Sequence, residues 1–324
     1  MLPNFGGKMK KLLCSVLAFF VLANIFAQEK VYLWPKKIGP GSEKVKVQEQ
    51  IIDRGAIPPF QNRAITGVTQ PYFEVYKPNE NPNGRGILII PGGAYQRVVY
   101  DTEGLDYTKQ FTEAGYTCFV LVYRTPNDGH KNRENIALQD AQRAMRIIKS
   151  KANDYGVLAH RIGVLGSSAG GHVAALLAAK YDAEVYKAYD AVDKNSDGKW
   201  NSAKPTFQIL VYPVITMSDS FTHKGSRTNL LGEKADSKMI DDFSCEKLVR
   251  YDSPDAFICA AIDDKSVNPE GNAIAYWKAM RAQNCKAELH IFPESGHGFG
   301  ITGAYGTAAN WQQMAILWLK TYQK

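Results

Sequence analysis

The stretch that most constrains the fold of this 324-residue chain runs from Arg161 to Ala174 and reads RIGVLGSSAGGHVA. Its apolar start, Ile162 to Leu165, is typical of a buried parallel strand. The residues from His172 to Lys180 are rich in strong helix formers. Between the two lies a G-x-S-x-G pattern, which in this context predicts a sharp strand-to-helix turn with a serine at its tip.

Ser168 is the serine that the glycine spacing places at this tip. Gly166 and Gly170 stand two residues before and after it, where the absence of a Cβ lets strand and helix approach each other. The N-terminus of the helix directs N–H groups and a positive dipole end to the same point, where an oxyanion would form. We therefore predict that Ser168 is a nucleophile. Ser167 is the alternative serine within the motif. The pattern alone also fits a glycine-rich turn with no catalytic role.

Strand-like and helix-like segments alternate along the rest of the chain. The pattern predicts strands at 64–69, 72–76, 86–90, 117–123, 162–165, 207–212, 256–262 and 287–292, and helices at 104–113, 135–150, 172–180, 272–282 and 308–322. Such alternation is expected to give an α/β fold, in which helices cover both faces of a mostly parallel central sheet.

Polar residues follow the last two predicted strands. Asp263 and Asp264 come directly after one strand, and His297 stands between two glycines after the other. Residues in these positions reach the crevice at the carboxyl ends of a parallel sheet. The order Ser168, Asp264, His297 is the chain order of catalytic residues in the α/β-hydrolase fold. We predict that His297 is the general base and Asp264 its partner; Asp263 is the alternative carboxylate. His172 is disfavoured as the base because it lies on the helix leaving the turn, where packing or capping is expected.

The segment Pro91-Gly92-Gly93-Ala94-Tyr95 follows another predicted core strand. Its glycines allow backbone N–H groups to face a ligand, although an ordinary turn would have the same composition. With a nucleophile downstream, we predict an oxyanion hole formed by the N–H groups of Gly93, Ala94 and Ala169. Tyr95 is predicted to contact substrate and to narrow the acyl pocket.

These motifs resemble those of the secreted esterase and lipase group of α/β-hydrolases. The resemblance also includes Tyr212-Pro213 and His223 to Gly232, and it covers roughly Val31 to the C-terminus. Two departures stand out. Pro91 and Ala94 replace the His and third Gly of the usual HGGG segment, and an insertion around 193–201 precedes the strand at 207–212.

The resemblance implies the α/β-hydrolase fold and a serine carboxylester hydrolase, because many members of the group are acetylxylan or carbohydrate acetyl esterases. The expected substrate is an acylated carbohydrate such as acetylated xylan, with a short acyl group, and no cofactor is required. Two other functions stay open: a serine peptidase of the prolyl-oligopeptidase type, and a non-catalytic carbohydrate-binding protein.

The N-terminal residues predict export. Lys10 and Lys11 precede a short apolar stretch that ends near Ala27, as in a secretory signal peptide. We expect cleavage after Ala27, a catalytic domain at 28–324 and a periplasmic or secreted enzyme without a membrane anchor. The net charge of +7 falls to +4 without the three lysines of this segment. The remaining basic residues form no stripe that would favour nucleic acid.

One polar segment fits a cation site. Residues 193–201 match D-x-N-x-D-G-x-x-N, an arrangement of oxygen ligands found in calcium-binding loops. Asp193, Asn195, Asp197 and Asn201 would be the ligands. The twelfth-position carboxylate of such loops is absent, so calcium is considered but not expected, and a polar surface hairpin is the alternative interpretation.

Overall fold

The computed structural model describes residues 29–35, 38–56, 60–218 and 220–323. The expected signal peptide at 1–27 lies outside these residues. In the described part of the chain, no helix is long and apolar enough to cross a bilayer.

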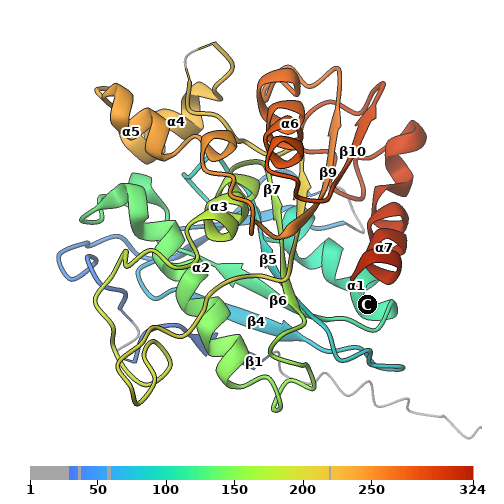
Figure 1. The fold of residues 1–324 in the computed structure, drawn as a ribbon. Coiled ribbons are helices and arrows are strands. Elements are labelled where there is room, and N and C mark those ends of the chain that lie inside the picture. Colours follow the sequence, from blue (N-terminus) through green and yellow to red (C-terminus); the bar gives the residue numbers. More distant parts are fainter. Residues whose placement is uncertain (1–28, 36–37, 57–59, 219, 324) are drawn as a thin grey trace, which may run out of the picture.

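An eight-stranded sheet forms the centre of the molecule (Figure 1). The strand order is β1-β4-β6-β5-β7-β8-β9-β10. The strands are β1 (Glu29–Tyr32), β4 (Tyr72–Tyr76), β5 (Gly86–Ile90), β6 (Thr117–Val122), β7 (Ile162–Ser167), β8 (Phe207–Val211), β9 (Asp255–Ala261) and β10 (Ala287–Phe292). β5 to β10 pair in parallel, whereas β4 pairs antiparallel with both β1 and β6. The predicted mostly parallel sheet is confirmed.

Helices cover both faces of this sheet. Neighbouring residues of a strand point to opposite sides, so their contacts show which helix lies on which face. On β8, the ring of Phe207 contacts Trp318, whereas Gln208 accepts a hydrogen bond from the Tyr276 hydroxyl. The helices that carry these two partners, α7 (Trp311–Tyr322) and α6 (Ala275–Ala282), therefore lie on opposite faces.

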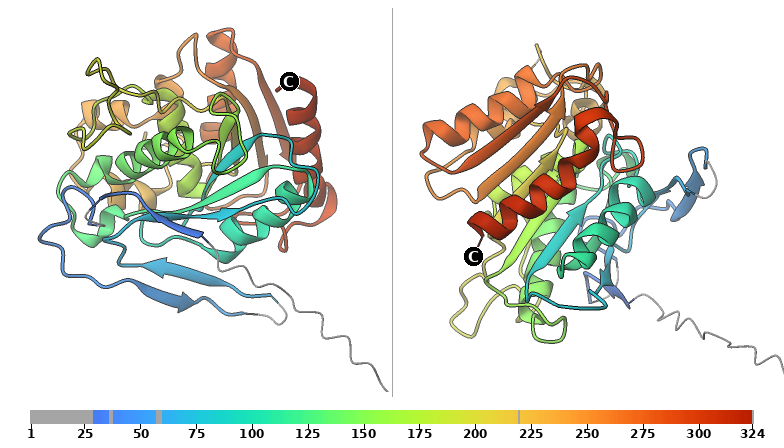
Figure 2. Two further views of the ribbon diagram at one scale, coloured as in Figure 1. Left: turned by 90° about the horizontal axis from the view of Figure 1, so that it is seen from below. Right: turned by 90° about the vertical axis from the view of Figure 1, so that its right-hand side faces the viewer.

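The other long helices complete the two layers (Figure 2). α1 (Asp106–Glu113) shares the face of α7, because the rings of Tyr107 and Trp311 meet edge to face at 5.3 Å. α2 (Arg133–Ser150) and α3 (Ser168–Ala179) pack against each other on the other face. The core strands β5, β6, β7 and β8 are buried along their whole length, as expected for a sheet covered on both sides.

Several elements were not predicted. They include β1 and β2 (Gln50–Asp53). β3 (Arg63–Thr66) overlaps the strand predicted at 64–69, and it pairs with β2 in a separate two-stranded sheet beside the main one (Figure 2). Two short helices, α4 (Lys224–Leu231) and α5 (Ser237–Asp242), follow β8. The expected helix at 104–113 begins with a π-helical turn, Asp101–Leu105. Cys118, Cys245, Cys259 and Cys285 are buried free thiols.

The segment after β1 is fastened to the body of the protein by a buried ion pair. Arg124 and Asp140 have no exposed side-chain surface and meet at 2.7 Å. The indole N–H of Trp34 donates to the same carboxylate at 3.0 Å. Arg124 also donates to the carbonyl of Pro40. This long-range network fixes the N-terminal region against α2.

Candidate active site

The predicted turn is present at the junction of β7 and α3. β7 ends at Ser167 and α3 begins at Ser168, which has a positive φ of 52°. A non-glycine residue in this region is strained and is held there by its surroundings. A Cβ added to Gly170 would lie 2.1 Å from the carbonyl oxygen of Ile90. The turn therefore packs directly against the end of β5, which is possible because Gly170 has no side chain.

Ser168, His297 and Asp264 form one hydrogen-bonded chain. Ser168 Oγ lies 2.9 Å from His297 Nε2, and His297 Nδ1 lies 2.7 Å from Asp264 Oδ2. A carboxylate only accepts hydrogen bonds, so Nδ1 carries the proton and Nε2 is free to accept from the serine hydroxyl. The Asp264 side chain is fully buried, and its Oδ1 accepts the N–H groups of Ser266 and Val267, each at 2.8 Å.

Asp263 and Ser167, the alternatives to Asp264 and Ser168, have other hydrogen-bond partners. Asp263 is exposed and accepts the N–H of Gly296 at 2.8 Å, so it supports the loop that carries His297. Ser167 Oγ is buried and lies 2.9 Å from the Tyr107 hydroxyl. Neither side chain is hydrogen-bonded to His297.

His172 is fully buried and both of its ring nitrogens are occupied. Nε2 donates to the carbonyl of Phe243 at 2.7 Å, and Nδ1 accepts the Tyr95 hydroxyl at 2.6 Å. Burial lowers the pKa of His172 to about 4, so its ring is neutral at neutral pH. Its role is packing, as expected for a residue on the helix behind the turn.

The predicted oxyanion donors lie at the ends of β5 and β7. Gly93 and Ala94 have positive φ values of 129° and 55°, and their N–H groups donate to no acceptor in the described part of the chain. The N–H of Ala169 belongs to the first turn of α3, where no intrahelical acceptor exists. Ser167, the N-cap, forms no side-chain cap. Three backbone donors are thus available beside Ser168.

The prediction for Tyr95 is wrong. Its side chain has no exposed surface and points into the interior, where the hydroxyl binds His172. The positive φ of 61° at Tyr95 turns the chain so that the ring packs behind the oxyanion loop, Pro91–Tyr95, rather than beside a substrate. It supports that loop and does not contact an acyl group.

Sequence reasoning missed the side chains that hold this loop. The Tyr123 hydroxyl donates to the carbonyl of Pro91 at 2.9 Å, and Asn229 of α4 donates to that of Ala94 at 2.8 Å. The carboxylate of Glu103 accepts the N–H of Gly92 at 2.7 Å. No local motif marks these residues, because each meets the loop through the tertiary fold.

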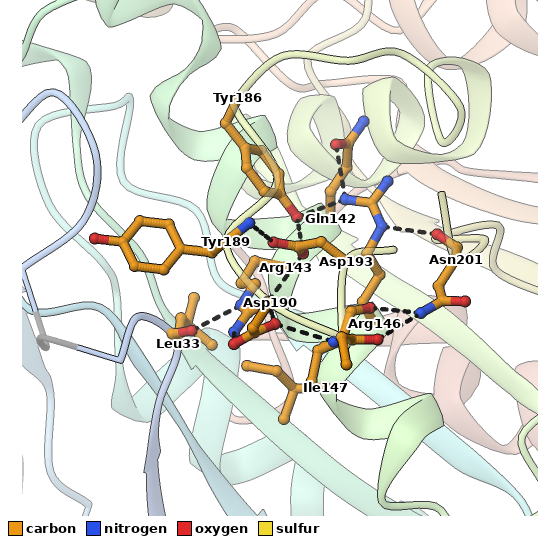
Figure 3. A network of polar contacts seen from close by, with 12 residues as sticks. Leu33, Gln142, Arg143, Arg146, Ile147, Tyr186, Tyr189, Asp190, Asp193 and Asn201 are labelled. Carbon is orange, nitrogen blue, oxygen red and sulfur yellow. Dashed lines mark hydrogen bonds and ion pairs between the residues drawn. The ribbon is translucent and has the colours of Figure 1, made fainter. Parts of the chain in front are cut away.

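Three of the four proposed calcium ligands have protein partners, and Figure 3 shows those of Asp193 and Asn201. Asp193 is buried, pairs with Arg143 at 2.9 Å and also accepts the Tyr186 hydroxyl. Asn195 caps its own turn, accepting the N–H groups of residues 197 and 199. Asn201 donates its amide to the carbonyls of residues 191 and 192, and Asp197 is exposed. The guanidinium of Arg143 thus balances the charge that calcium would have balanced. No group of three His, Cys, Asp or Glu residues in the described segments is arranged to hold a metal.

Comparison with known proteins identifies the family. The family model described as BD-FAE matches residues 73–276, from the second residue of β4 to the first turn of α6. The chain belongs to the BD-FAE family. Ser168 and Asp264 lie within the matched residues, and His297 follows them.

Curated relatives and solved structures agree with this family. The chain is 33% identical over 225 residues to an acetylxylan esterase of Xylanibacter ruminicola, covering 68% of this chain and 42% of the relative. It is 31% identical over 231 residues to endo-1,4-beta-xylanase B of Butyrivibrio fibrisolvens, covering 71% and 35%. It therefore spans less than half the length of these relatives.

A solved structure, that of an acetyl ester-xyloside bifunctional hydrolase from Caldicellulosiruptor lactoaceticus, is similar over most of both chains. It has 27% identity and a TM-score of 0.71, and the match covers 91% of this chain and 96% of that one. A carboxylesterase from Lactobacillus plantarum, with 23% identity and a TM-score of 0.62, shares the fold. The α/β-hydrolase fold is thereby confirmed.

Replacing Asp264 tests which carboxylate serves His297. Asp264→Asn is expected to lower kcat for p-nitrophenyl acetate by about 10⁴-fold, because an amide would favour the wrong histidine tautomer. Asp263→Asn keeps the acceptor for the Gly296 N–H and should cost less than about ten-fold. Equal losses in the two variants would contradict the assignment.

The Arg143–Asp193 pair is expected to stabilise the insertion without calcium. Arg143→Ala leaves the buried Asp193 carboxylate without its cation, which should lower the free energy of unfolding by about 3–5 kcal/mol. Calcium or a chelator should leave the melting temperature of the wild-type protein unchanged. A calcium-dependent rise in that temperature would contradict this assignment and favour the metal site.

Proposed function

We propose that this chain is a serine carboxylester hydrolase that removes short acyl groups, acetyl above all, from carbohydrate such as acetylated xylan. The observation that carries the proposal is the hydrogen-bonded chain from Ser168 through His297 to Asp264, next to three backbone N–H donors. A nucleophile, a base oriented by a buried carboxylate and an oxyanion site are the parts that acyl transfer needs.

The chemistry proceeds through an acyl-enzyme. His297 Nε2 takes the proton of Ser168 as Oγ attacks the ester carbonyl, and the N–H groups of Gly93, Ala94 and Ala169 stabilise the oxyanion. The sugar hydroxyl leaves with the proton from His297. Water then attacks the acyl-serine with His297 again as base, and release of the carboxylic acid restores Ser168. Asp264 stabilises the imidazolium at both steps.

The substrate class rests on the relatives and on the sequence. An acetylxylan esterase and an acetyl ester-xyloside hydrolase are among the proteins that this chain resembles. The segments between the predicted strands are short or polar, as at 127–132, and offer no long apolar lid. A long acyl chain would need apolar walls, since each buried methylene contributes about 0.8 kcal/mol.

We also propose that the protein is exported, on the basis of the lysines and the apolar stretch that precede residue 28. This location would bring the enzyme to polysaccharides outside the cytoplasm. N-terminal sequencing of the mature protein is expected to begin at Gln28.

The nucleophile is tested by a matched pair of serine variants. Ser168→Ala should reduce hydrolysis of p-nitrophenyl acetate to a small residue over the uncatalysed rate, with little change in melting temperature. Ser167→Ala removes a buried hydroxyl that meets Tyr107, and should affect stability more than kcat. An inactive Ser167→Ala protein beside an active Ser168→Ala protein would refute the proposal for Ser168.

Substrate length and sugar release test the proposed specificity. We expect kcat/KM for p-nitrophenyl esters to fall steeply from acetate to octanoate, and acetate to be released from acetylated xylan or its oligosaccharides. A preference for octanoate would contradict the short-acyl proposal. Good turnover of p-nitrophenyl acetate without acetate release from any acetylated glycan would overturn the sugar substrate but keep the esterase.

A further inference from the structure

Glu103 is a buried carboxyl group directly behind the proposed oxyanion site. It lies in the π-helical turn Asp101–Leu105 and is 5% exposed. One of its oxygens, Oε2, accepts the N–H of Gly92 at 2.7 Å. The other, Oε1, accepts the Tyr212 hydroxyl at 3.3 Å. The mechanism derived above assigns no role to this charged group.

Gly92 is held between Glu103 and the nucleophile. A Cβ at Gly92 would lie 2.6 Å from Glu103 Oε2 and 2.8 Å from Ser168 Cβ. No side chain fits there, because the carboxyl group and the serine side chain both lie close to Gly92. The hydrogen bond from Gly92 fixes the peptide that leads directly to the N–H groups of Gly93 and Ala94.

Tyr212 links Glu103 to the loop that carries His297, the proposed general base. Its ring meets the His297 ring at 5.1 Å, with an angle of 64° between the planes. The Tyr212 hydroxyl accepts the N–H of Gly300, three residues after His297, at 3.1 Å. Tyr212 has a positive φ of 36°, so this position is strained and is held by its contacts.

The hydroxyl groups of this network can all be satisfied when Glu103 is ionised. Tyr212 has one proton to give, and its oxygen already accepts the N–H of Gly300. It can therefore donate to Glu103 while accepting from Tyr107, 3.1 Å away, which in turn accepts from Ser167. Every donor then points toward the carboxylate, which only accepts.

We propose that Glu103 is a positioning residue: one carboxylate holds Gly92 of the oxyanion loop and, through Tyr212, the loop and ring of His297. The proposal rests on the function proposed above. It predicts that Glu103 affects the transition state, in which the oxyanion and the imidazolium exist, more than the binding of substrate.

The charge of Glu103 also acts on the site. Burial raises the pKa of Glu103, and the neighbouring His297 and the hydrogen bonds from Gly92 and Tyr212 oppose that rise. Arg54, Tyr107 and Tyr123 also interact electrostatically with Glu103. His223 and Asp264 lie near His297 in the same way. A carboxylate at this position stabilises the imidazolium form of the base. Removing its charge should therefore extend activity to lower pH.

Three variants separate charge, hydrogen bonding and burial. Glu103→Gln removes the charge, and its amide can satisfy both neighbours if the Tyr212 hydroxyl turns to Tyr107. Glu103→Ala removes both contacts. Asp101→Asn is the control, because Asp101 is a buried carboxylate of the same turn that pairs instead with Arg63 at 2.8 Å.

The measurements are kcat, KM and the pH profile of kcat/KM with p-nitrophenyl acetate. Glu103→Gln should lower kcat by about ten-fold with KM little changed. It should also move the acid limb of the profile to lower pH. Glu103→Ala should lower kcat by about 10²–10³-fold, as when an oxyanion donor is lost. Asp101→Asn should keep the wild-type acid limb.

A Glu103→Gln protein with wild-type kcat and an unmoved acid limb would overturn the proposal, as would the same limb shift in Asp101→Asn. The rate at which a p-nitrophenyl phosphonate modifies Ser168, followed by mass spectrometry, provides a second measurement that needs no turnover. It should fall in Glu103→Gln, and an unchanged rate would also count against Glu103. Failure of the proposed function would instead appear in the wild-type protein, as absence of acetate release from glycans.

Discussion

The contact between the start of α3 and the end of β5 is the constraint on which the site depends. Ser168 has a positive φ because the chain must turn from strand to helix within one residue. Gly170 then passes so close to the carbonyl of Ile90 that no Cβ fits between them. The same contact brings the first helical N–H groups beside the loop that follows β5. Nucleophile and oxyanion donors are thus placed by one packing interaction.

A second feature is the number of buried side chains that hold the oxyanion loop. Polar groups from four separate segments reach it, and each uses a different atom of the loop. They are Tyr123 on Pro91, Glu103 on Gly92, Asn229 on Ala94 and His172 on Tyr95. Backbone donors fixed in advance need no reorganisation when charge develops in the transition state, which is where such preorganisation lowers the barrier. Two non-glycine residues with positive φ remain in the loop because these contacts hold them.

Local sequence signals were sufficient for most strands of the central sheet and for the order of the catalytic residues along the chain. The strands at 72–76, 86–90 and 287–292 have the predicted bounds, because apolar residues between turn-forming residues define them locally. Ser168, Asp264 and His297 meet because each follows a strand of one parallel sheet, and such ends share an edge.

Side-chain direction and long-range pairing were not predictable in this way. Tyr95 was expected to face substrate, but the backbone conformation of its own residue turns it inward. Glu103 stands one residue before the helix predicted at 104–113, and its importance follows from where Gly92 and Tyr212 lie. The 193–201 motif has the spacing of a cation loop, but Arg143 from α2 supplies the positive charge.

The most direct test of the proposed mechanism is to identify the residue that becomes acylated. The protein would be mixed with p-nitrophenyl acetate, quenched in acid within the first turnover and digested, and the acetylated peptide sequenced by mass spectrometry. We expect acetyl on Ser168, and we expect its amount to fall once the substrate is consumed and water has hydrolysed the acyl-enzyme. Acetyl on Ser167 or His172, or hydrolysis with no acetylated peptide at any time point, would contradict it.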